Sequence, residues 1–360
     1  TIVYAAIVIR KNQLPQFITL GNEAQINWCL TGGKKDTKET RVNSLYRSSL
    51  KGKDNNETFA GDSLYSIVWK PLLPYLKNIT TISYAPDGLL HKVAFHALPS
   101  AKGTLLLDEF RLQQYASIRQ LAENKNDAIQ LKSVYLMGNA DFNSLSKTTA
   151  TQGVNVSLNR SASNDSWAAL PGTEKEVNAL QPLFTTKGVN VIASTGVGAT
   201  EEKFKSLNNH SPAVIHLATH GFFLPDPKNK KNVGEENTYA MSSDPLMRSG
   251  IIMAGANKAW SGEKIPVGIE DGIATAYEIA QLNLSNTKLV VLSACETALG
   301  DLNGSEGVFG LQRSFKIAGV KNLIVSLWQV PDKETGELMN IFYTNLLNGN
   351  NVRESFYKAQ

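Results

Sequence analysis

The chain has 360 residues, of which 42% are hydrophobic, and this is enough to bury one large core or two modest ones. Its 36 basic and 32 acidic residues are interspersed and leave a net charge of +4, so the charge pattern indicates no dedicated nucleic-acid surface. No apolar run reaches about 18 residues and no signal-peptide pattern is present, so we expect no membrane span. Two cysteines, Cys29 and Cys295, favour a reducing compartment, and we expect the cytoplasm.

The N-terminal residues are predicted to form strands followed by a polar linker. Apolar or alternating runs at 1–9, 16–20 and 23–30 predict three strands at an edge of the molecule. Residues 31–61 are rich in Lys, Asp, Asn, Thr, Ser and Gly, which is typical of a linker or insertion. Cys29 lies in the third apolar run, so we expect it to be a buried core thiol.

The next segment, residues 62–130, mixes helical and extended patterns. Apolar side chains recur at helical spacing over residues 64–72, with Pro71 as a predicted kink. His91 and His96 stand apart from any nucleophile in the sequence, and we expect structural roles for both.

From residue 131 the chain alternates between apolar strands and helices of about a dozen residues. This alternation predicts an open, mainly parallel α/β sheet with helices on both faces, accompanied by an N-terminal lobe that is β-rich and pseudo-symmetric. The helix after residue 170 is expected to begin with a capping box, in which Glu176 follows Thr173 by three residues. The predicted parts are N-terminal strands with a linker, an N-terminal lobe and a large α/β lobe: residues 1–61, 62–130 and 131–360.

Two of the predicted strands end in residues that suit nucleophilic catalysis. One strand ends at His220, and the strand at 289–292 runs into Cys295. Ligands of open α/β sheets lie outside the carboxyl ends of the strands, so we expect both side chains at the same edge. A nearby imidazole and a following helix N-terminus both favour the thiolate, which is the form that attacks. The residues alone also allow a buried, inert thiol and a packed histidine.

His216 and His220 form an H-x-x-x-H pattern, which raises the question of a zinc site. Zinc-binding pairs at this spacing lie on a helix, whereas Val214 and Ile215 predict a strand. Four residues of a strand span roughly 13 Å at about 3.3 Å each, too far for two ligands of one zinc ion. We therefore expect no metal site, and a core position for His216 on the same face as His220.

Five motifs together resemble the CHAT family of caspase-like, separase-related cysteine proteases: PDGLLHKVAFHALP, LPGTEKEV, HLATHG, LVVLSACETALG and GVFGLQRSFKIAGVKNLIVSLWQVPD. The resemblance covers the chain from about residue 64 to its end. It implies a caspase-like fold, a catalytic pair of His220 and Cys295, and an oxyanion hole made by the N–H groups of Gly221 and Cys295. It implies no cofactor.

The resemblance also implies a substrate platform on the strand NLIVSLWQVPD, along which an extended peptide binds. Ser326 and Trp328 are two residues apart, so they face the same side and are candidate substrate-binding residues. Asp332 is similar in position to the acidic residue with which separases select an arginine at P1, so we expect a preference for a basic P1 residue. Asp332 also precedes a predicted helix, where aspartate is a good N-cap, and the two roles remain open.

These features predict a cysteine endopeptidase that cuts a protein substrate through an acyl-enzyme at Cys295. The alternative is a catalytically silent, caspase-like scaffold that binds a peptide. A nucleotide-binding domain is disfavoured, because no glycine-rich phosphate loop follows a strand in the required order.

The resemblance implies activation by a sensor or repeat module, as in bacterial antiviral defence. The chain starts at Thr1 rather than Met, and it lacks the aromatic final strand usual in the family. We therefore expect a piece of a longer protein, with a tetratricopeptide-repeat region outside this chain. The expected partners are a protein substrate and that region, with no membrane and no directly bound nucleic acid.

Overall fold

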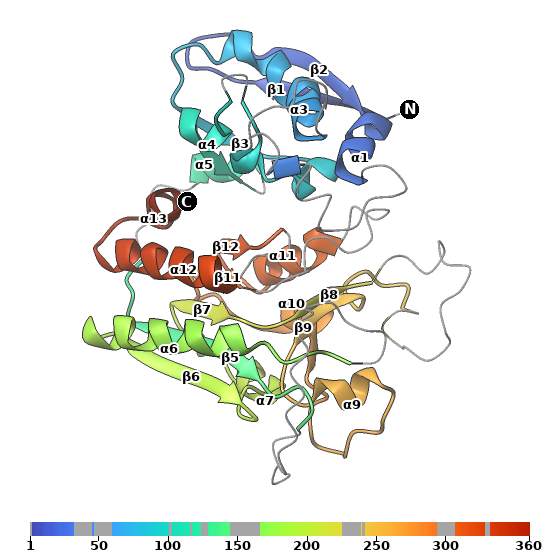
Figure 1. The fold of residues 1–360 in the computed structure, drawn as a ribbon, viewed down its shortest axis with the longest axis vertical. Helices are drawn as coiled ribbons and strands as arrows, with labels where there is room; N and C mark the ends of the chain where they lie inside the picture. Colours follow the sequence, from blue (N-terminus) through green and yellow to red (C-terminus); the bar gives the residue numbers. More distant parts are fainter. Residues whose placement is uncertain are drawn as a thin grey trace. The chain divides into compact units, whose positions relative to one another are not determined.

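The structure, a computed structural model, describes residues 2–31, 45–46, 60–100, 103–115, 117–123, 129–144, 166–224, 239, 242–293, 307–327 and 332–360. The side chains of residues 307–309 and 332 are not described. The chain divides into two compact units, Thr1–Lys125 and Asn126–Gln360 (Figure 1). The predicted boundaries at residues 61 and 130 remain predictions.

The N-terminal unit begins with an antiparallel hairpin of β1 (Val3–Val8) and β2 (Gln16–Asn22). The third predicted strand is wrong, because this segment is helix α1 (Glu23–Thr31). A reciprocal pair of hydrogen bonds starts the helix: the N–H of Gln25 donates to Asn22 Oδ1, and the N–H of Asn22 donates to Gln25 Oε1, both at 2.9 Å. Such a pair satisfies two amides that a helix start leaves without partners, and it favours the helix over the alternating pattern.

Helix α1 buries Ile26, Cys29 and Leu30, which lie on one helical face. The core position predicted for Cys29 is therefore confirmed, although the residue reaches the core from a helix rather than a strand. Burial raises the pKa of the Cys29 thiol, so this cysteine is a poor nucleophile.

The rest of this unit consists of short elements, including a parallel pair of strands, β3 and β4. The helical run predicted over residues 64–72 is present, and it changes type near Pro71, where a 3-10 helix takes over. Nε2 of His96 lies 3.0 Å from the carbonyl oxygen of Leu112, and burial lowers the pKa of His96, which fits a structural role. The elements are α3 (Ala60–Leu64), η3 (Tyr65–Trp69), η4 (Lys70–Tyr75), β3 (Thr81–Tyr84), η5 (Gly88–Lys92), η6 (Phe95–Ala97), α4 (Leu106–Glu109), β4 (Arg111–Gln114) and α5 (Arg119–Glu123).

The C-terminal unit is built on a five-stranded parallel sheet in the order β12-β11-β7-β5-β6. The strands are β5 (Ser133–Ala140), β6 (Asn190–Gly196), β7 (Val214–Leu217), β11 (Leu289–Leu292) and β12 (Asn322–Val325). The helices packed around them are α6 (Pro171–Thr186), α7 (Glu201–Lys205), α10 (Ala276–Gln281), α11 (Gly307–Ile317), α12 (Asp332–Leu347) and α13 (Val352–Ala359). The predicted parallel α/β sheet is confirmed, and it is compatible with a caspase-like fold.

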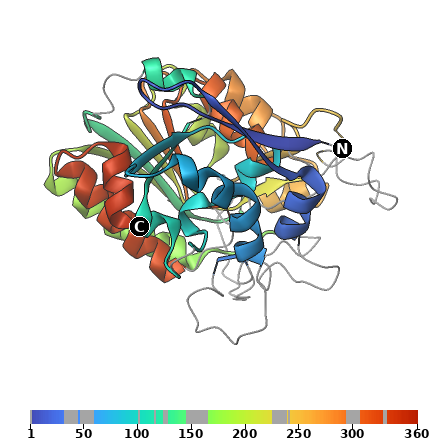
Figure 2. The ribbon, with the colours of Figure 1, turned by 90° about the horizontal axis from the view of Figure 1, so that it is seen from above.

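Both faces of this sheet are covered, because successive side chains of a strand point to opposite sides. In β7, Val214 packs in the cluster formed with α6 and α12, whereas Ile215 packs in the cluster formed with α7, α10 and α11. Figure 2 shows α6 (green) and α12 (red) on the same side of the sheet. Helix α6 approaches β5 closely at Gly138, where an added Cβ would lie 2.7 Å from the carbonyl oxygen of Thr173.

After β7 the chain enters a second, antiparallel sheet in the order β10-β9-β8. Its strands are β8 (Gly221–Phe223), β9 (Ser249–Ile252) and β10 (Ile273–Thr275), and α9 (Ala256–Trp260) follows β9. His220 joins the two sheets, since it lies after β7 and immediately before β8. Its carbonyl oxygen accepts a hydrogen bond of 2.9 Å from the N–H of Ile252.

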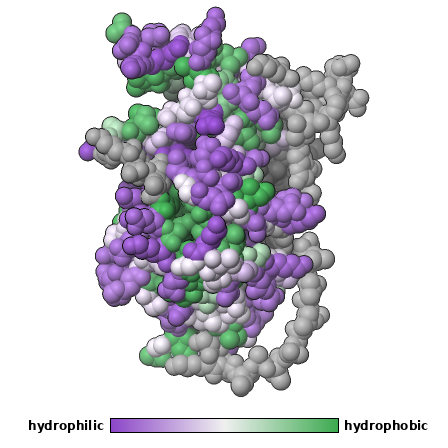
Figure 3. Space-filling view, turned by 90° about the vertical axis from the view of Figure 1, so that its left-hand side faces the viewer, coloured by the Kyte–Doolittle hydropathy of each residue, from purple (hydrophilic) through white to green (hydrophobic). Residues whose placement is uncertain are grey.

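On the face that Figure 3 shows, the coloured surface is mostly polar, with apolar patches in green. Several large apolar side chains of the β1–β2 hairpin region are exposed, and two of them, Ile7 and Phe17, lie opposite each other across the hairpin. In the described part of the chain, no helix combines the length and the apolar character that crossing a membrane requires.

Candidate active site

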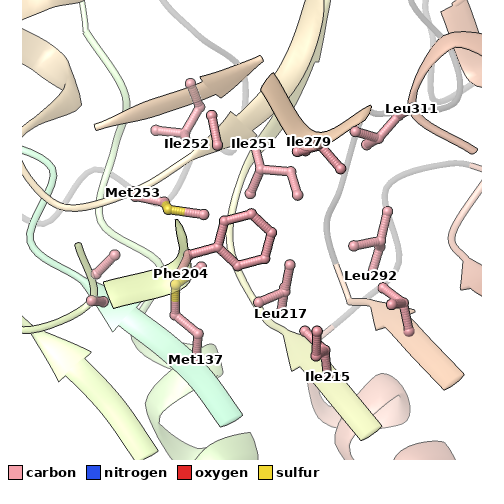
Figure 4. Close-up of a cluster of buried hydrophobic side chains, with 14 of the residues drawn as sticks. Met137, Phe204, Ile215, Leu217, Ile251, Ile252, Met253, Ile279, Leu292 and Leu311 are labelled. Atoms are coloured by element: carbon pink, nitrogen blue, oxygen red, sulfur yellow. The ribbon is translucent and has the colours of Figure 1, made fainter. Parts of the chain in front are cut away.

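The carboxyl ends of β7 and β11 are neighbours in the sheet. The strands pair in parallel with Leu217 opposite Leu292, and Figure 4 shows both side chains in the same buried cluster. His220 follows Leu217 by three residues, and Cys295 follows Leu292 by three residues. Neighbouring strands lie about 4.8 Å apart, so the chain leaves the sheet at adjacent points in the two segments. Cys295 lies outside the described residues, and its distance from His220 remains a prediction.

The His220 side chain is held by a backbone carbonyl and two aromatic rings. Its Nε2 lies 2.7 Å from the carbonyl oxygen of Ala168, and the rings of Phe142 and Trp167 are each centred 5.2 Å from the imidazole. Because a carbonyl oxygen only accepts hydrogen bonds, this contact requires the proton on Nε2. The exchangeable second proton then belongs to Nδ1. His220 is only 1% exposed.

A cluster of polar side chains lies on the other face of the sheet, and it includes Ser293, the last described residue before the segment that contains Cys295. The Ser293 hydroxyl donates to Glu176 Oε2 at 3.0 Å, and Glu176 Oε1 lies 3.1 Å from His216 Nε2. The latter two atoms are not aligned for a hydrogen bond and have no other partner among the described residues. Tyr343 completes the group, with its hydroxyl 3.1 Å from His216 Nδ1. Burial and the Glu176 carboxylate raise the pKa of Tyr343.

This group overturns two predictions. Glu176 is not a capping residue: α6 begins at Pro171, and Thr173 binds the N–H of Asn139 in β5 with its hydroxyl at 2.8 Å. His216 is a core residue, as predicted, but it does not share a face with His220. His216 contacts Tyr343, in the α6 and α12 cluster, whereas the rings around His220 belong to the opposite cluster. The strand alternation ends at Leu217, so it does not extend to His220.

The other predicted site residues are only partly described. Gly221 is the first residue of β8 and is buried. Ser326 directly follows β12, the neighbour of β11, and is half-buried. Trp328 lies outside the described residues. Helix α12 starts at Asp332 itself, but the Asp332 side chain is not described, so its S1 and capping roles remain predictions.

A cluster of three carboxylates elsewhere in the unit could suit a metal ion: Glu201, Glu270 and Glu278. Lys205 occupies its centre, with Nζ at 2.7, 2.9 and 2.8 Å from these carboxylates in that order. Burial alone would lower the pKa of Lys205, but its hydrogen bonds to the carboxylates raise it. The cluster therefore has its own internal cation.

The comparisons with known proteins agree with the fold. The CHAT domain family matches residues 59–360. Tetratricopeptide repeat protein 28 of Mus musculus is 27% identical over 281 residues, which are 76% of this chain and 11% of that protein. The Homo sapiens protein of the same name is 27% identical over 271 residues, or 73% of this chain and 10% of that protein. The chain thus spans about a tenth of the length of these relatives.

The five-stranded parallel α/β sheet is compatible with a caspase-like fold. The family match covers most of the sequence, and the chain belongs to the CHAT domain family, which is related to caspase-like peptidases.

Proposed function

We propose that this chain is a cysteine endopeptidase that uses Cys295 and His220 to cut a protein substrate. The observation that carries the proposal is the equal register of two adjacent strands: each residue follows by three positions a leucine, and the two leucines lie opposite each other in the sheet. The fixed Nε2 proton of His220 also supports it, because it leaves Nδ1 to carry a proton to and from the reaction.

In the proposed reaction, the Cys295 thiolate attacks the carbonyl carbon of the scissile bond. The N–H groups of Gly221 and Cys295 stabilise the resulting oxyanion. His220 donates its Nδ1 proton to the leaving amine, the peptide C–N bond breaks, and the acyl-enzyme remains. Water then attacks the thioester, His220 accepts a proton from the water, and the C–S bond breaks to release the carboxyl product and restore the Cys295 thiolate. Asp332 binds a basic P1 side chain, and Ser326 and Trp328 bind the extended peptide.

A catalytically silent scaffold is the second candidate, and the burial of His220 favours it, since an imidazole with 1% exposure offers little surface to a substrate. Because the relatives are named as tetratricopeptide repeat proteins, we also propose that the chain works beside such repeats. Activation by that region in the cytoplasm, in antiviral defence, is the proposed context.

The two candidates differ in the chemistry of one thiol, which iodoacetamide can measure. An activated thiolate at Cys295 should be alkylated at least about tenfold faster than an ordinary thiol at pH 7. Cys29 serves as an internal reference, because it is buried and its pKa is raised. Mass spectrometry of the peptides that contain Cys295 and Cys29 gives the two alkylation rates. In a second assay, quenched fluorescent peptides with Arg, Lys or Ala at P1 measure cleavage, with Cys295→Ala as the inactive control. A Cys295 labelled as slowly as Cys29, with no cleavage, would leave only the scaffold.

A further inference from the structure

Asn257 lies next to the segments that enclose His220. It is the second residue of α9 and only 8% exposed. Its backbone N–H donates to the carbonyl oxygen of Phe142 at 2.9 Å. Its main chain therefore already fixes one of the two aromatic residues that contact the imidazole.

The Asn257 side chain holds the second segment from both sides. The N–H of Trp167 donates to Asn257 Oδ1 at 2.6 Å, and Asn257 Nδ2 donates back to the carbonyl oxygen of Trp167 at 3.1 Å. Nδ2 also donates to Asn143 Oδ1 at 2.8 Å. Rotating the amide by 180° would place Nδ2 against the N–H of Trp167, and Oδ1 against the carbonyl oxygen of Trp167 and Asn143 Oδ1. These partners therefore fix the orientation of the amide. A buried amide with this many matched partners is costly to replace.

Both segments end at the imidazole. Trp167 contributes its ring, and the next residue, Ala168, contributes the carbonyl oxygen 2.7 Å from His220 Nε2. Phe142 contributes the other ring contact. We propose that Asn257 is a positioning residue that fixes the Trp167–Ala168 backbone and thereby keeps the proton of His220 on Nε2. This inference rests on the proposed function for its effect on catalysis, but not for its effect on the imidazole.

The tautomer of His220 can be measured without any substrate. In ¹⁵N-histidine-labelled protein, long-range ¹H–¹⁵N spectra distinguish a ring protonated on Nε2 from one protonated on Nδ1, and a His220→Gln variant assigns the signal. We expect a single Nε2-protonated form in the unaltered chain. Asn257→Ala should give a mixture of tautomers. Asn257→Asp, which keeps the acceptor for Trp167 but loses both donor bonds, should do the same.

The matched control is Asn283→Asp, since Asn283 is an exposed asparagine whose side chain bonds only to Asn209 and the local backbone. Alkylation of Cys295 should slow by about 10- to 100-fold in the Asn257 variants, because small misplacements of a reacting group reduce rates by this much. The alkylation rate should also lose the inflection with pH that depends on His220. The control should match the unaltered chain in both readouts.

An unchanged tautomer and pH profile in a folded Asn257 variant would overturn the inference. If neither variant folds, the unaltered chain still decides, because an Nδ1-protonated His220 contradicts the role assigned to Ala168 and Asn257. A chain whose Cys295 shows no His220-dependent alkylation would refute the proposed function, while the tautomer measurement would still test Asn257.

Discussion

His216 and His220 are four residues apart, and the molecule treats them in opposite ways. His216 is enclosed by side chains with ionisable groups, Glu176 and Tyr343, and both of its nitrogens face them. His220 contacts two aromatic rings and a backbone carbonyl oxygen. Around His216, the Tyr343 hydroxyl lies within hydrogen-bond distance of Nδ1, and Glu176 lies beside Nε2 without an aligned hydrogen bond. Around His220, the carbonyl oxygen of Ala168 fixes the proton on Nε2.

Burial alone does not distinguish the two histidines. Both side chains are at most 1% exposed. What separates them is the chemistry of the neighbouring groups. A carboxyl oxygen of Glu176 lies beside His216, whereas a backbone carbonyl oxygen and two aromatic rings lie beside His220.

The largest expected effect is on activity. His220→Ala should lower the rate of peptide cleavage by about 10²- to 10⁴-fold, because a positioned acid–base group contributes that much. His210→Ala is the control, since His210 is exposed in the same unit. The measurement is kcat/KM on the quenched peptides, and a loss of less than about tenfold would place the proton transfer on another group.

The next effect is on stability. Glu176→Ala should lower the free energy of unfolding by about 2 to 6 kcal/mol, because two buried polar groups lose the side chain beside them, at about 1 to 3 kcal/mol each. Ser293 and His216 both lose their partner in this variant. Urea unfolding measures the change, with Glu174→Ala, an exposed acid of the same helix, as control. Equal midpoints for the two variants would contradict the buried contacts.

The smallest effect concerns the phenol. Tyr343→Phe removes only the hydroxyl that lies 3.1 Å from His216 Nδ1, and it should cost about 1 to 3 kcal/mol, the range for leaving one buried polar group without a partner. Tyr277→Phe is the matched control, because Tyr277 is 46% exposed. Thermal unfolding should give a lower Tm for Tyr343→Phe than for the control. Equal Tm values would show that the contact between the Tyr343 hydroxyl and His216 contributes no stability.

The main sheet could be predicted because each of its strands is visible in a short, local stretch of the sequence. Strands such as β7 and β11 are buried on both faces, so they appear in the sequence as short apolar runs between helices. The same pattern predicts that His220 follows one strand and Cys295 follows another. Strand β8 was missed, because three residues are too few to display a period of two.

The contacts that hold the site could not be predicted, because they join residues far apart in the sequence. Glu176 accepts from Ser293 across 117 positions, and Asn257 binds Trp167 across 90. The local pattern predicts that Glu176 forms a capping box with Thr173. In the structure, Thr173 bonds to Asn139 in β5 and Glu176 bonds to Ser293. Helix α1 differs from the predicted strand for a local reason. The reciprocal hydrogen bonds between Asn22 and Gln25 start a helix where the alternating pattern predicts a strand.

One consequence follows from the position of His220 between two sheets. The residue belongs to neither the parallel sheet nor the antiparallel one, and its carbonyl is tied to Ile252 of β9. A ligand that shifted β8 and β9 relative to the parallel sheet would therefore move the imidazole without touching it. The amide of Ile252 would report that motion in hydrogen exchange, which makes the coupling between the two sheets measurable.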